Sequence, residues 1–350
     1  MNIQTQPTLV ASSRKANLMW PSISGDGSTI AYAKSEEDDG LFRYRDGETV
    51  KLSEGSSAWQ DISTDGDAIS FMRTFGYESR QVHRWTPERT KVLADEPGYG
   101  RPTHISPDGP TVVWTSDQSL QRGHRSDVLT WHDGQIKEVS DAPKAYEGRL
   151  PGESGLTVWV EYPERYSPRE FVFKKNSEES TRVVNILGHQ PEGWDVSADG
   201  NQIVFSEWDV EEKGWDLFLH NALENTTIGI ATDNTDALHP DISADGSAIA
   251  YTSRTGDDQG SIKVFRDGKT FEVESPSDGY NLAPSISDDG KHLAWTAIEG
   301  RARSIYKTAL VDPSGALEKD FSRRMGGSIS SGVPCPVARH SNKGPPSVST

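Results

Sequence analysis

The sequence has little of several features that define common classes of protein. It has a single cysteine, Cys335, so no disulfide can form within the chain and the redox compartment stays open. No stretch approaches the roughly 18 apolar residues of a membrane-spanning helix. The first residues, 1–20, have no apolar core of the length that a secretory signal needs. We therefore expect a soluble protein without membrane insertion, cytoplasmic or associated with an assembly, and leave periplasmic and extracellular locations open.

Positive charge is also scarce. The chain has 36 Lys and Arg against 53 Asp and Glu, which gives a formal net charge of −17. Such a surface repels phosphate backbones and anionic lipid, so nucleic acid is not an expected partner. Basic proteins, cations and neutral glycans remain as classes of ligand.

Motifs of common catalytic sites are missing. The sequence contains no Gly-x-Ser-x-Gly elbow, no His-Glu-x-x-His and no cysteine pair for zinc. We therefore predict no catalytic residue and leave enzymatic activity undecided, with a non-catalytic role favoured. The acidic run 36–39 lacks the spaced ligands of a dedicated calcium loop. We predict no cofactor, although a divalent cation such as Ca²⁺ stays open.

A repeated turn dominates what the sequence does contain. Seven times a short apolar run ends in a Ser-x-Asp-Gly type of turn and a second apolar run follows, at a period of about 40 to 45 residues. The turns lie at Ser24–Gly27, Ser63–Gly66, Ser106–Gly109, a degraded Pro151–Ser154, Ser197–Gly200, Ser243–Gly246 and Ser287–Gly290. A period of this length, filled with short strands, is typical of propeller blades.

One repeat predicts four strands. In the first unit they are Pro21–Ser24, Thr29–Ala33, Leu41–Arg45 and Thr49–Leu52, with a second Asp-Gly hairpin at Asp46. We predict an all-β fold, a seven-bladed β-propeller of four-stranded antiparallel blades over residues 21–322. Residues 1–20 form an arm and 323–350 a tail rich in Gly, Ser and Pro. Thr8–Ala11 and Ala316–Phe321 compete for the strand that closes the ring.

The repeat resembles that of a known family. The pattern Pro-x-Ile-Ser-x-Asp-Gly-x-x-Ile-Ala-Tyr, at Pro21–Tyr32 and Pro240–Tyr251, is similar to the repeat of TolB-type (PD40, WD40-like) propellers. The same repeat occurs in the propeller domains of prolyl oligopeptidase-like and tricorn-type peptidases and in oligogalacturonate lyases. The resemblance spans residues 20–322 and implies the fold, but the roles of these proteins differ, so it implies no single activity.

Strand order places the tight Asp-Gly turns on one rim of the propeller and the longer loops with the blade connectors on the other. The longer loops more often carry function. We expect the channel mouth on that second rim to gather a mixed set of aromatic, charged and polar residues. They are Trp20, Trp59, Asp61, Arg101, His104, Arg149, Trp194, Asp195, His239, Asp241 and Asn281.

Two functions fit this set. The first is a non-catalytic interaction platform that binds a protein or peptide partner through the loop and connector rim, within a larger assembly. The alternative is a glycan-binding or glycan-cleaving, lyase-like propeller that uses the Trp, His and carboxylate mouth, with His104 and His239 near a metal. The Trp rings could instead pack between blades, and this structural role is the favoured interpretation.

Overall fold

The computed structural model describes residues 2–3, 6–75, 79–97, 102–117, 126–140, 145–152, 155–161, 169–175, 181–186, 193–211, 213–232, 235–256 and 260–310. The chain divides into two units, Met1–Val311 and Asp312–Thr350, and the second lies outside the described residues. The description below therefore concerns the first unit. No helix in its described residues is long and apolar enough to cross a membrane.

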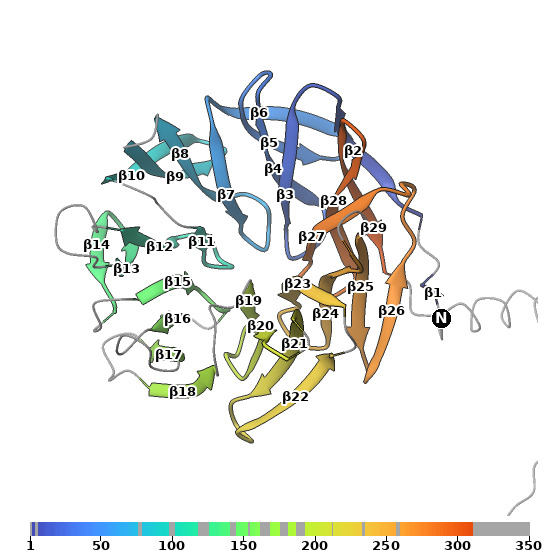
Figure 1. Cartoon of the computed structure of the whole chain (residues 1–350). Helices are drawn as coiled ribbons and strands as arrows, with labels where there is room; N and C mark the ends of the chain where they lie inside the picture. Colours follow the sequence, from blue (N-terminus) through green and yellow to red (C-terminus); the bar gives the residue numbers. More distant parts are fainter. Residues whose placement is uncertain are drawn as a thin grey trace, which may run out of the picture. The chain divides into compact units, whose positions relative to one another are not determined.

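Seven antiparallel sheets surround a common axis, which confirms the predicted seven-bladed β-propeller (Figure 1). In each blade the strand nearest the axis comes first in the list that follows. Blade 1 contains β3 (Asn17–Ile23), β4 (Thr29–Ser35), β5 (Gly40–Arg45) and β6 (Glu48–Glu54). Blade 2 contains β7 (Ser57–Ile62), β8 (Ile69–Phe75), β9 (Ser79–Thr86) and β10 (Arg89–Pro97). Blade 3 contains β11 (Thr103–Ile105), β12 (Thr111–Asp117), β13 (Ser126–His132) and β14 (Gln135–Glu138).

The second half of the ring follows the same order. Blade 4 contains β15 (Ala145–Arg149), β16 (Leu156–Glu161), β17 (Arg169–Lys175) and β18 (Thr181–Ile186). Blade 5 contains β19 (Trp194–Val196), β20 (Gln202–Asp209), β21 (Gly214–Asn221) and β22 (Thr226–Ala231). Blade 6 contains β23 (Asp236–Ile242), β24 (Ala248–Arg254), β25 (Gly260–Arg266) and β26 (Lys269–Val273). Blade 7 contains β27 (Tyr280–Ile286), β28 (His292–Glu299), β29 (Ala302–Ala309) and, as its outer strand, β2 (Thr8–Ser13).

The N-terminal segment closes the ring. β2 pairs antiparallel with β29, so the first residues of the chain complete the last blade. A further short strand, β1 (Asn2–Ile3), pairs parallel with the outer edge of β26. The competing closure segment, Ala316–Phe321, lies outside the described residues.

The Ser-x-Asp-Gly turns are held by one recurring set of hydrogen bonds. In the first, Ser24 Oγ donates to Asp26 Oδ1 at 2.7 Å and accepts the backbone N–H of Thr29 at 3.0 Å. Asp26 Oδ1 also accepts the N–H of Ser28 at 2.9 Å, and Gly27 supplies the left-handed φ of 71°. The Asp of this turn is therefore a structural acceptor, as side chains of this type are in many turns.

The hydrophobic core is divided among the seams between consecutive blades. Each seam has its own cluster of buried apolar residues, and each cluster contains one aromatic residue from the second strand of a blade. These equivalent aromatics are Tyr32, Phe71, Trp114, Trp159, Phe205, Tyr251 and Trp295, all buried. Because every blade is buried on both faces by its neighbours, stability depends on all the seams of the ring.

Candidate functional site

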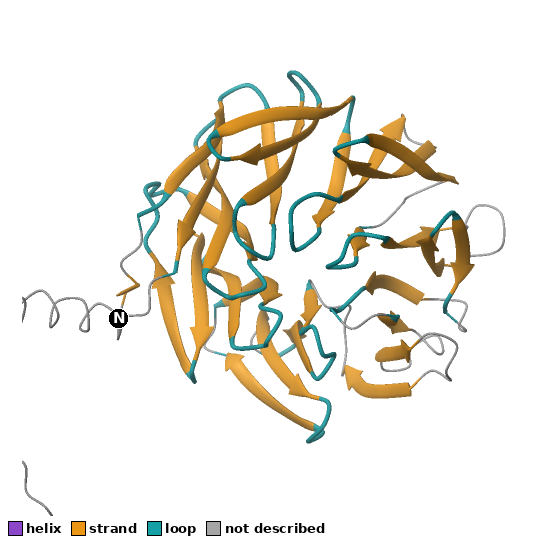
Figure 2. Ribbon diagram, turned by 180° about the vertical axis from the view of Figure 1, so that it is seen from behind, coloured by secondary structure: helices purple, strands orange, loops and turns teal. Residues whose placement is uncertain are grey.

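One residue of each inner strand faces the axis of the propeller. It stands two positions before the turn Ser, or before Pro151 in blade 4, where strand alternation turns it away from the apolar seams. The seven axial residues are Ser22, Asp61, His104, Arg149, Asp195, Asp241 and Ser285, and all line a cavity of about 240 Å³. Figure 2 shows the inner strands around this axis from behind.

The cavity lies toward the rim of the Ser-x-Asp-Gly turns. Its lining includes the second residue of six turns, namely Thr64, Pro107, Gly152, Ala198, Ala244 and Asp288. Asp288 crosses the turn of blade 1 and accepts a hydrogen bond from Thr64 Oγ1 at 2.5 Å. A Cβ on Gly25 would stand 2.0 Å from Asp288 Oδ2, so the Asp288 side chain would have to move to admit one.

Axial oxygens hold the next blade in place. Oδ2 of Asp61, Asp195 and Asp241 accepts the backbone N–H of Ile105, Ile242 and Ile286 at 3.0, 3.1 and 2.7 Å. Ser285 Oγ does the same for Ile23 at 3.2 Å. These bonds satisfy inner-strand donors through one carboxylate oxygen of each Asp, and Oδ1 of Asp61 also accepts the N–H of Ile62 at 2.9 Å.

The remaining donors and acceptors form a chain around the axis. Ser22 Oγ donates to Asp61 Oδ1 at 3.2 Å, and His104 Nδ1 lies 3.3 Å from Asp61 Oδ2. Arg149 contacts His104 Nε2, donates to the carbonyl of Trp194 at 3.0 Å and lies 3.7 Å from Asp195 Oδ1. Because Arg149 can only donate, His104 Nε2 accepts and Nδ1 carries the proton.

The pKa values follow from this order. Burial and the nearby Arg149 guanidinium lower the pKa of His104, so its imidazole is neutral at pH 7. Burial alone would raise the pKa of Asp61, but His104 and the N–H groups of Ile105 and Ile62 lower it. Asp61 is therefore ionised while its histidine neighbour is not.

Asp241 behaves in the opposite way. Burial and the hydrogen-bonded carboxylate of Asp195 raise the pKa of Asp241 well above its usual value. Two neighbouring carboxylates cannot both be ionised at low cost, which favours the protonated form of Asp241. Burial raises the pKa of Asp288 too, although Thr64 counteracts it. The cavity thus contains four carboxyl groups and one guanidinium.

The structure divides the predicted site residues into two groups. Asp61, His104, Arg149, Trp194, Asp195 and Asp241 line the cavity, whereas Trp20, Trp59, His239 and Asn281 do not. Arg101 lies outside the described residues. Asn281 is buried in blade 7, where its Oδ1 accepts from Trp295 Nε1 at 3.1 Å. The predicted residues therefore do not all line this cavity.

Two of the three predicted Trp rings are packed against protein. Trp194 is 1% exposed and its ring lies 4.9 Å from that of Phe171 in the seam between blades 4 and 5. Trp59 packs on the core of the seam between blades 2 and 3, with the Arg80 guanidinium 5.3 Å from the centre of its ring. Only Trp20, at 41% exposure, presents much of its ring to solvent.

Sequence reasoning missed a backbone feature on the far side of the axial residues. In five blades, the residue two positions before the axial residue lies at a β-bulge and has a φ between 49° and 54°. These residues are Trp20, Trp59, Glu147, His239 and Ala283. A left-handed conformation is unusual for large side chains. Aligning the repeats on the axial residue would have brought these five together, but no residue type marks the bulge.

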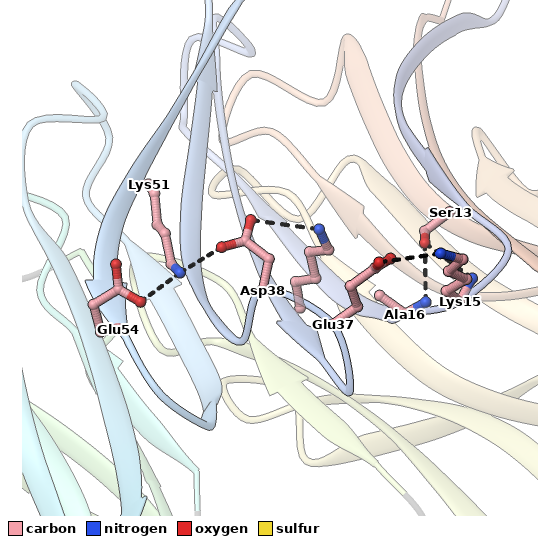
Figure 3. A network of polar contacts seen from close by, with 8 residues as sticks. Ser13, Lys15, Ala16, Glu37, Asp38, Lys51 and Glu54 are labelled. Carbon is pink, nitrogen blue, oxygen red and sulfur yellow. Dashed lines mark hydrogen bonds and ion pairs between the residues drawn. The ribbon is translucent and has the colours of Figure 1, made fainter.

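The acidic loop of blade 1 is neutralised by lysine. Asp38 lies 2.7 Å from Lys51 Nζ, and Glu37 lies 3.4 Å from Lys15 Nζ (Figure 3). Lys34 Nζ lies 3.5 Å from Asp38. Among the described residues, no group of three His, Cys, Asp or Glu side chains is arranged to hold a metal ion. Both ring nitrogens of His104 are engaged, so this residue offers no free lone pair.

Comparisons with known proteins support the fold. No protein-family model matches the chain, and neither does any curated protein. The propeller domain of the Trilobed protease from Pyrococcus furiosus is 13% identical with a TM-score of 0.66, covering 85% of this chain and 98% of that one. TolB from Acinetobacter baumannii is 14% identical with a TM-score of 0.52, covering 77% and 66%.

A third solved structure is an enzyme bound to a metal. An oligogalacturonate lyase in complex with manganese is 10% identical with a TM-score of 0.63, covering 89% of this chain and 97% of that one. Identities this low, shared with a protease, TolB and a lyase, show architecture and not activity. The chain is therefore a seven-bladed β-propeller, similar in fold to TolB and to the propellers of these enzymes.

Proposed function

We propose that this propeller is a non-catalytic interaction platform that receives a positively charged group of a protein or peptide partner in its axial cavity. The observation that carries the proposal is that Asp195 and Asp241 both line that cavity, where the carboxyl group of Asp195 raises the pKa of Asp241. A proton relieves their repulsion in the free protein. An ammonium or guanidinium group from a partner would relieve it equally well and release the proton.

The charges of the lining favour a cation. Asp61, Asp195, Asp241 and Asp288 face a single guanidinium, that of Arg149. The donors of Arg149 already serve His104, Asp195 and the carbonyl of Trp194, so it has little capacity left for an anionic ligand. The net charge of −17 would also steer basic partners toward the protein from a distance.

The size of the cavity favours part of a larger partner. Small-molecule sites commonly have volumes of about 300–1,000 Å³, whereas this cavity has about 240 Å³. A lysine or arginine side chain or a chain terminus fits that scale better than a whole metabolite. The lining includes the second residue of six of the repeated turns. We therefore propose the contact on the rim of these turns, whereas the sequence analysis placed it on the opposite rim, with the longer loops and blade connectors.

The glycan alternative has less support. It depends on aromatic faces that could stack on sugar rings, and two of the three Trp rings are packed against protein or beneath Arg80. It also depends on His104 and His239 acting together, and only His104 lines the cavity. A partner's basic side chain needs neither feature.

The test begins with a random peptide library displayed on phage and selected on the full chain. We expect enrichment of Lys or Arg, or of a free N-terminus, at one position. Calorimetry of a selected peptide in two buffers of different ionisation enthalpy should then show proton release on binding. Asp241→Asn keeps a hydrogen-bond donor toward Asp195 and should weaken binding at least about tenfold.

The matched control is Asp46→Asn, which makes the same substitution in an exposed hairpin of blade 1. It should bind as the parent protein does. Selection of acidic or apolar peptides, or equal binding by the two Asn variants, would contradict the proposal.

A further inference from the structure

Blade 5 carries the most exposed large apolar side chains among the described residues. Leu223 is 77%, Val210 68% and Ile228 53% exposed, and all three belong to this blade. Two of them lie at its outer edge: Ile228 in β22 and Leu223 in the turn that precedes it. Asn221 Oδ1 accepts the N–H of Leu223 at 3.0 Å, so the turn that presents Leu223 is held in place.

Other outer strands protect their edges with charge. β6, β10 and β14 each carry one similarly exposed residue, Val50, Val92 and Ile136, at 44%, 47% and 47%. Each of these strands also carries charged residues, such as Lys51, Lys91 and Lys137. Charged side chains on an edge strand disfavour pairing with another chain.

β22 has no such protection. Its sequence, Thr-Thr-Ile-Gly-Ile-Ala, contains no charged residue. β2 also lacks charge, but Pro7 precedes it directly and Arg14 and Lys15 follow it. β26 carries Lys269 and Glu272 and is covered by β1. β18 carries Arg182.

The edge of β22 is regular enough to pair. Thr226–Gly229 pair residue by residue with β21, and a bulge follows between Gly229 and Ala231. No described strand lies on the other side of β22, which Figure 1 shows at the periphery of blade 5. The backbone N–H and C=O groups along this edge are therefore directed away from the sheet.

We propose that the outer edge of β22 pairs antiparallel with β22 of a second copy of this chain, about a two-fold axis near Ile228. Two copies with a net charge of −17 each repel, so they can approach closely only where charge is absent. β22 itself carries no charged residue on either copy, and Glu224 stands two residues before it. An antiparallel two-fold pairing brings the two Ile228 side chains together across the strands and joins blade 5 of each copy into one continuous sheet.

The chain already uses this kind of contact within itself. β1 adds to the outer edge of β26 in the adjacent blade, with Asn2 opposite Glu272 and Ile3 opposite Val273. An outer edge of this propeller can therefore accept an additional strand. Unlike the proposed use of the axial cavity, self-pairing at β22 needs no other protein.

Sedimentation velocity of the full chain over a range of concentrations tests the proposal, together with hydrogen exchange of the β22 amides. We expect a monomer–dimer equilibrium in which protection of Thr226–Gly229 rises with concentration. Ile228→Lys should raise the dimer dissociation constant at least about tenfold. Val92→Lys, an equally exposed change on the charged strand β10, should leave it unchanged.

Circular dichroism and thermal unfolding of both variants confirm that they fold, as expected for exposed positions. A chain that stays monomeric at every concentration overturns the proposal. So does a dimer that persists in Ile228→Lys, since another surface would then be responsible. Strong β22 protection in a monomer also overturns it, because a segment of the same chain would then cover the edge.

Discussion

Two sectors of the ring hold their blades together by different means. From blade 5 through blades 6, 7, 1 and 2 to blade 3, consecutive turns are linked by backbone hydrogen bonds. Examples are Ala198 N–H to the Ala244 carbonyl at 2.8 Å and Ala244 N–H to the Asp288 carbonyl at 3.0 Å. Among the described residues, no such bond links the turn of blade 4 to either neighbour.

The sequence around blade 4 explains the interruption. Pro107 has no N–H to donate toward blade 4, and Pro151-Gly152 replaces the Ser-x pair in the turn of blade 4 itself. Side chains take over in this sector. Arg149 bonds to the Trp194 carbonyl of blade 5, and Phe171, Trp194 and Phe205 fill the seam. Arg149 and Trp194, the basic and the aromatic residue of the cavity lining, therefore lie beside the least regular blade, blade 4.

The largest expected effects come from emptying a seam in each sector. Trp295→Ala, in the regular seam between blades 6 and 7, should lower the free energy of unfolding by about 3–5 kcal/mol, because Trp295 is fully buried. Phe171→Ala, between blades 4 and 5, should have a similar cost by denaturant unfolding. It should also speed hydrogen exchange at Trp194–Val196, because no turn bond supports that seam. Equal exchange at the inner strands of both variants would contradict the distinction between sectors.

A fall in pH from 7 should change the stability contributed by the two sectors with opposite sign. His83 is 5% exposed in blade 2, and burial and Arg73 lower its pKa to about 4, with Asp95 opposing. Its unfolded pKa is higher, so this stability is complete above about pH 6.5 and is lost as pH falls, about 3 kcal/mol by pH 4. His83→Phe should remove most of that acid dependence in urea titrations at pH 7, 5 and 4. An unchanged slope would contradict the assignment.

Glu207, which faces the irregular seam, gives the opposite sign. Burial raises its pKa to about 7, with Asp216 adding to the shift and Arg169 opposing it. A raised carboxyl pKa contributes stability below the unfolded pKa of about 4.5 and loses it as pH rises through 7. Glu207→Gln should therefore remove the loss of stability that this carboxyl causes between about pH 4.5 and 7, and leave the slope below pH 4.5 unchanged.

The smallest effects should come from ion pairs that connect blades. Arg149→Ala leaves Asp195, at 20% side-chain exposure, without its guanidinium and should cost about 2 kcal/mol. Arg45→Ala removes the pair with Asp67, which joins blades 1 and 2 at 2.6 Å but leaves Asp67 48% exposed. That change should cost less than about 1 kcal/mol. A reversed order in thermal unfolding would show that Arg149 does not support its sector.

Much of this architecture could be predicted from the sequence. The repeated turn marks the first two strands of each unit, and seven such units predict seven blades. The hairpin at Asp46 and Gly47 requires two consecutive residues in the left-handed conformation, which few pairs other than Asp-Gly adopt. Ring closure was not readable, since Thr8–Ala11 and Ala316–Phe321 have similar strand character. Only pairing with β29 distinguishes the former.

Part of the site could also be predicted from the sequence, for a related reason. Asp61, His104, Asp195 and Asp241 hold equivalent places in their strands, so alignment brought them together. Trp20, Trp59 and His239 stand two positions earlier, on a bulge that no local composition marks. The side of the channel on which a cavity opens depends on how side chains pack around the axis, and the repeat carries no signal for that.

Carbon-13 NMR titration of the aspartate carboxyl groups, with Asp195 and Asp241 assigned through their Asn variants, tests the central claim most directly. We predict that one carboxyl of the pair keeps its proton well above pH 4 in the free protein and loses it when a selected basic peptide binds. Full ionisation of both carboxyl groups near pH 4 in the free protein, or a proton that stays in place in the complex, would contradict this account.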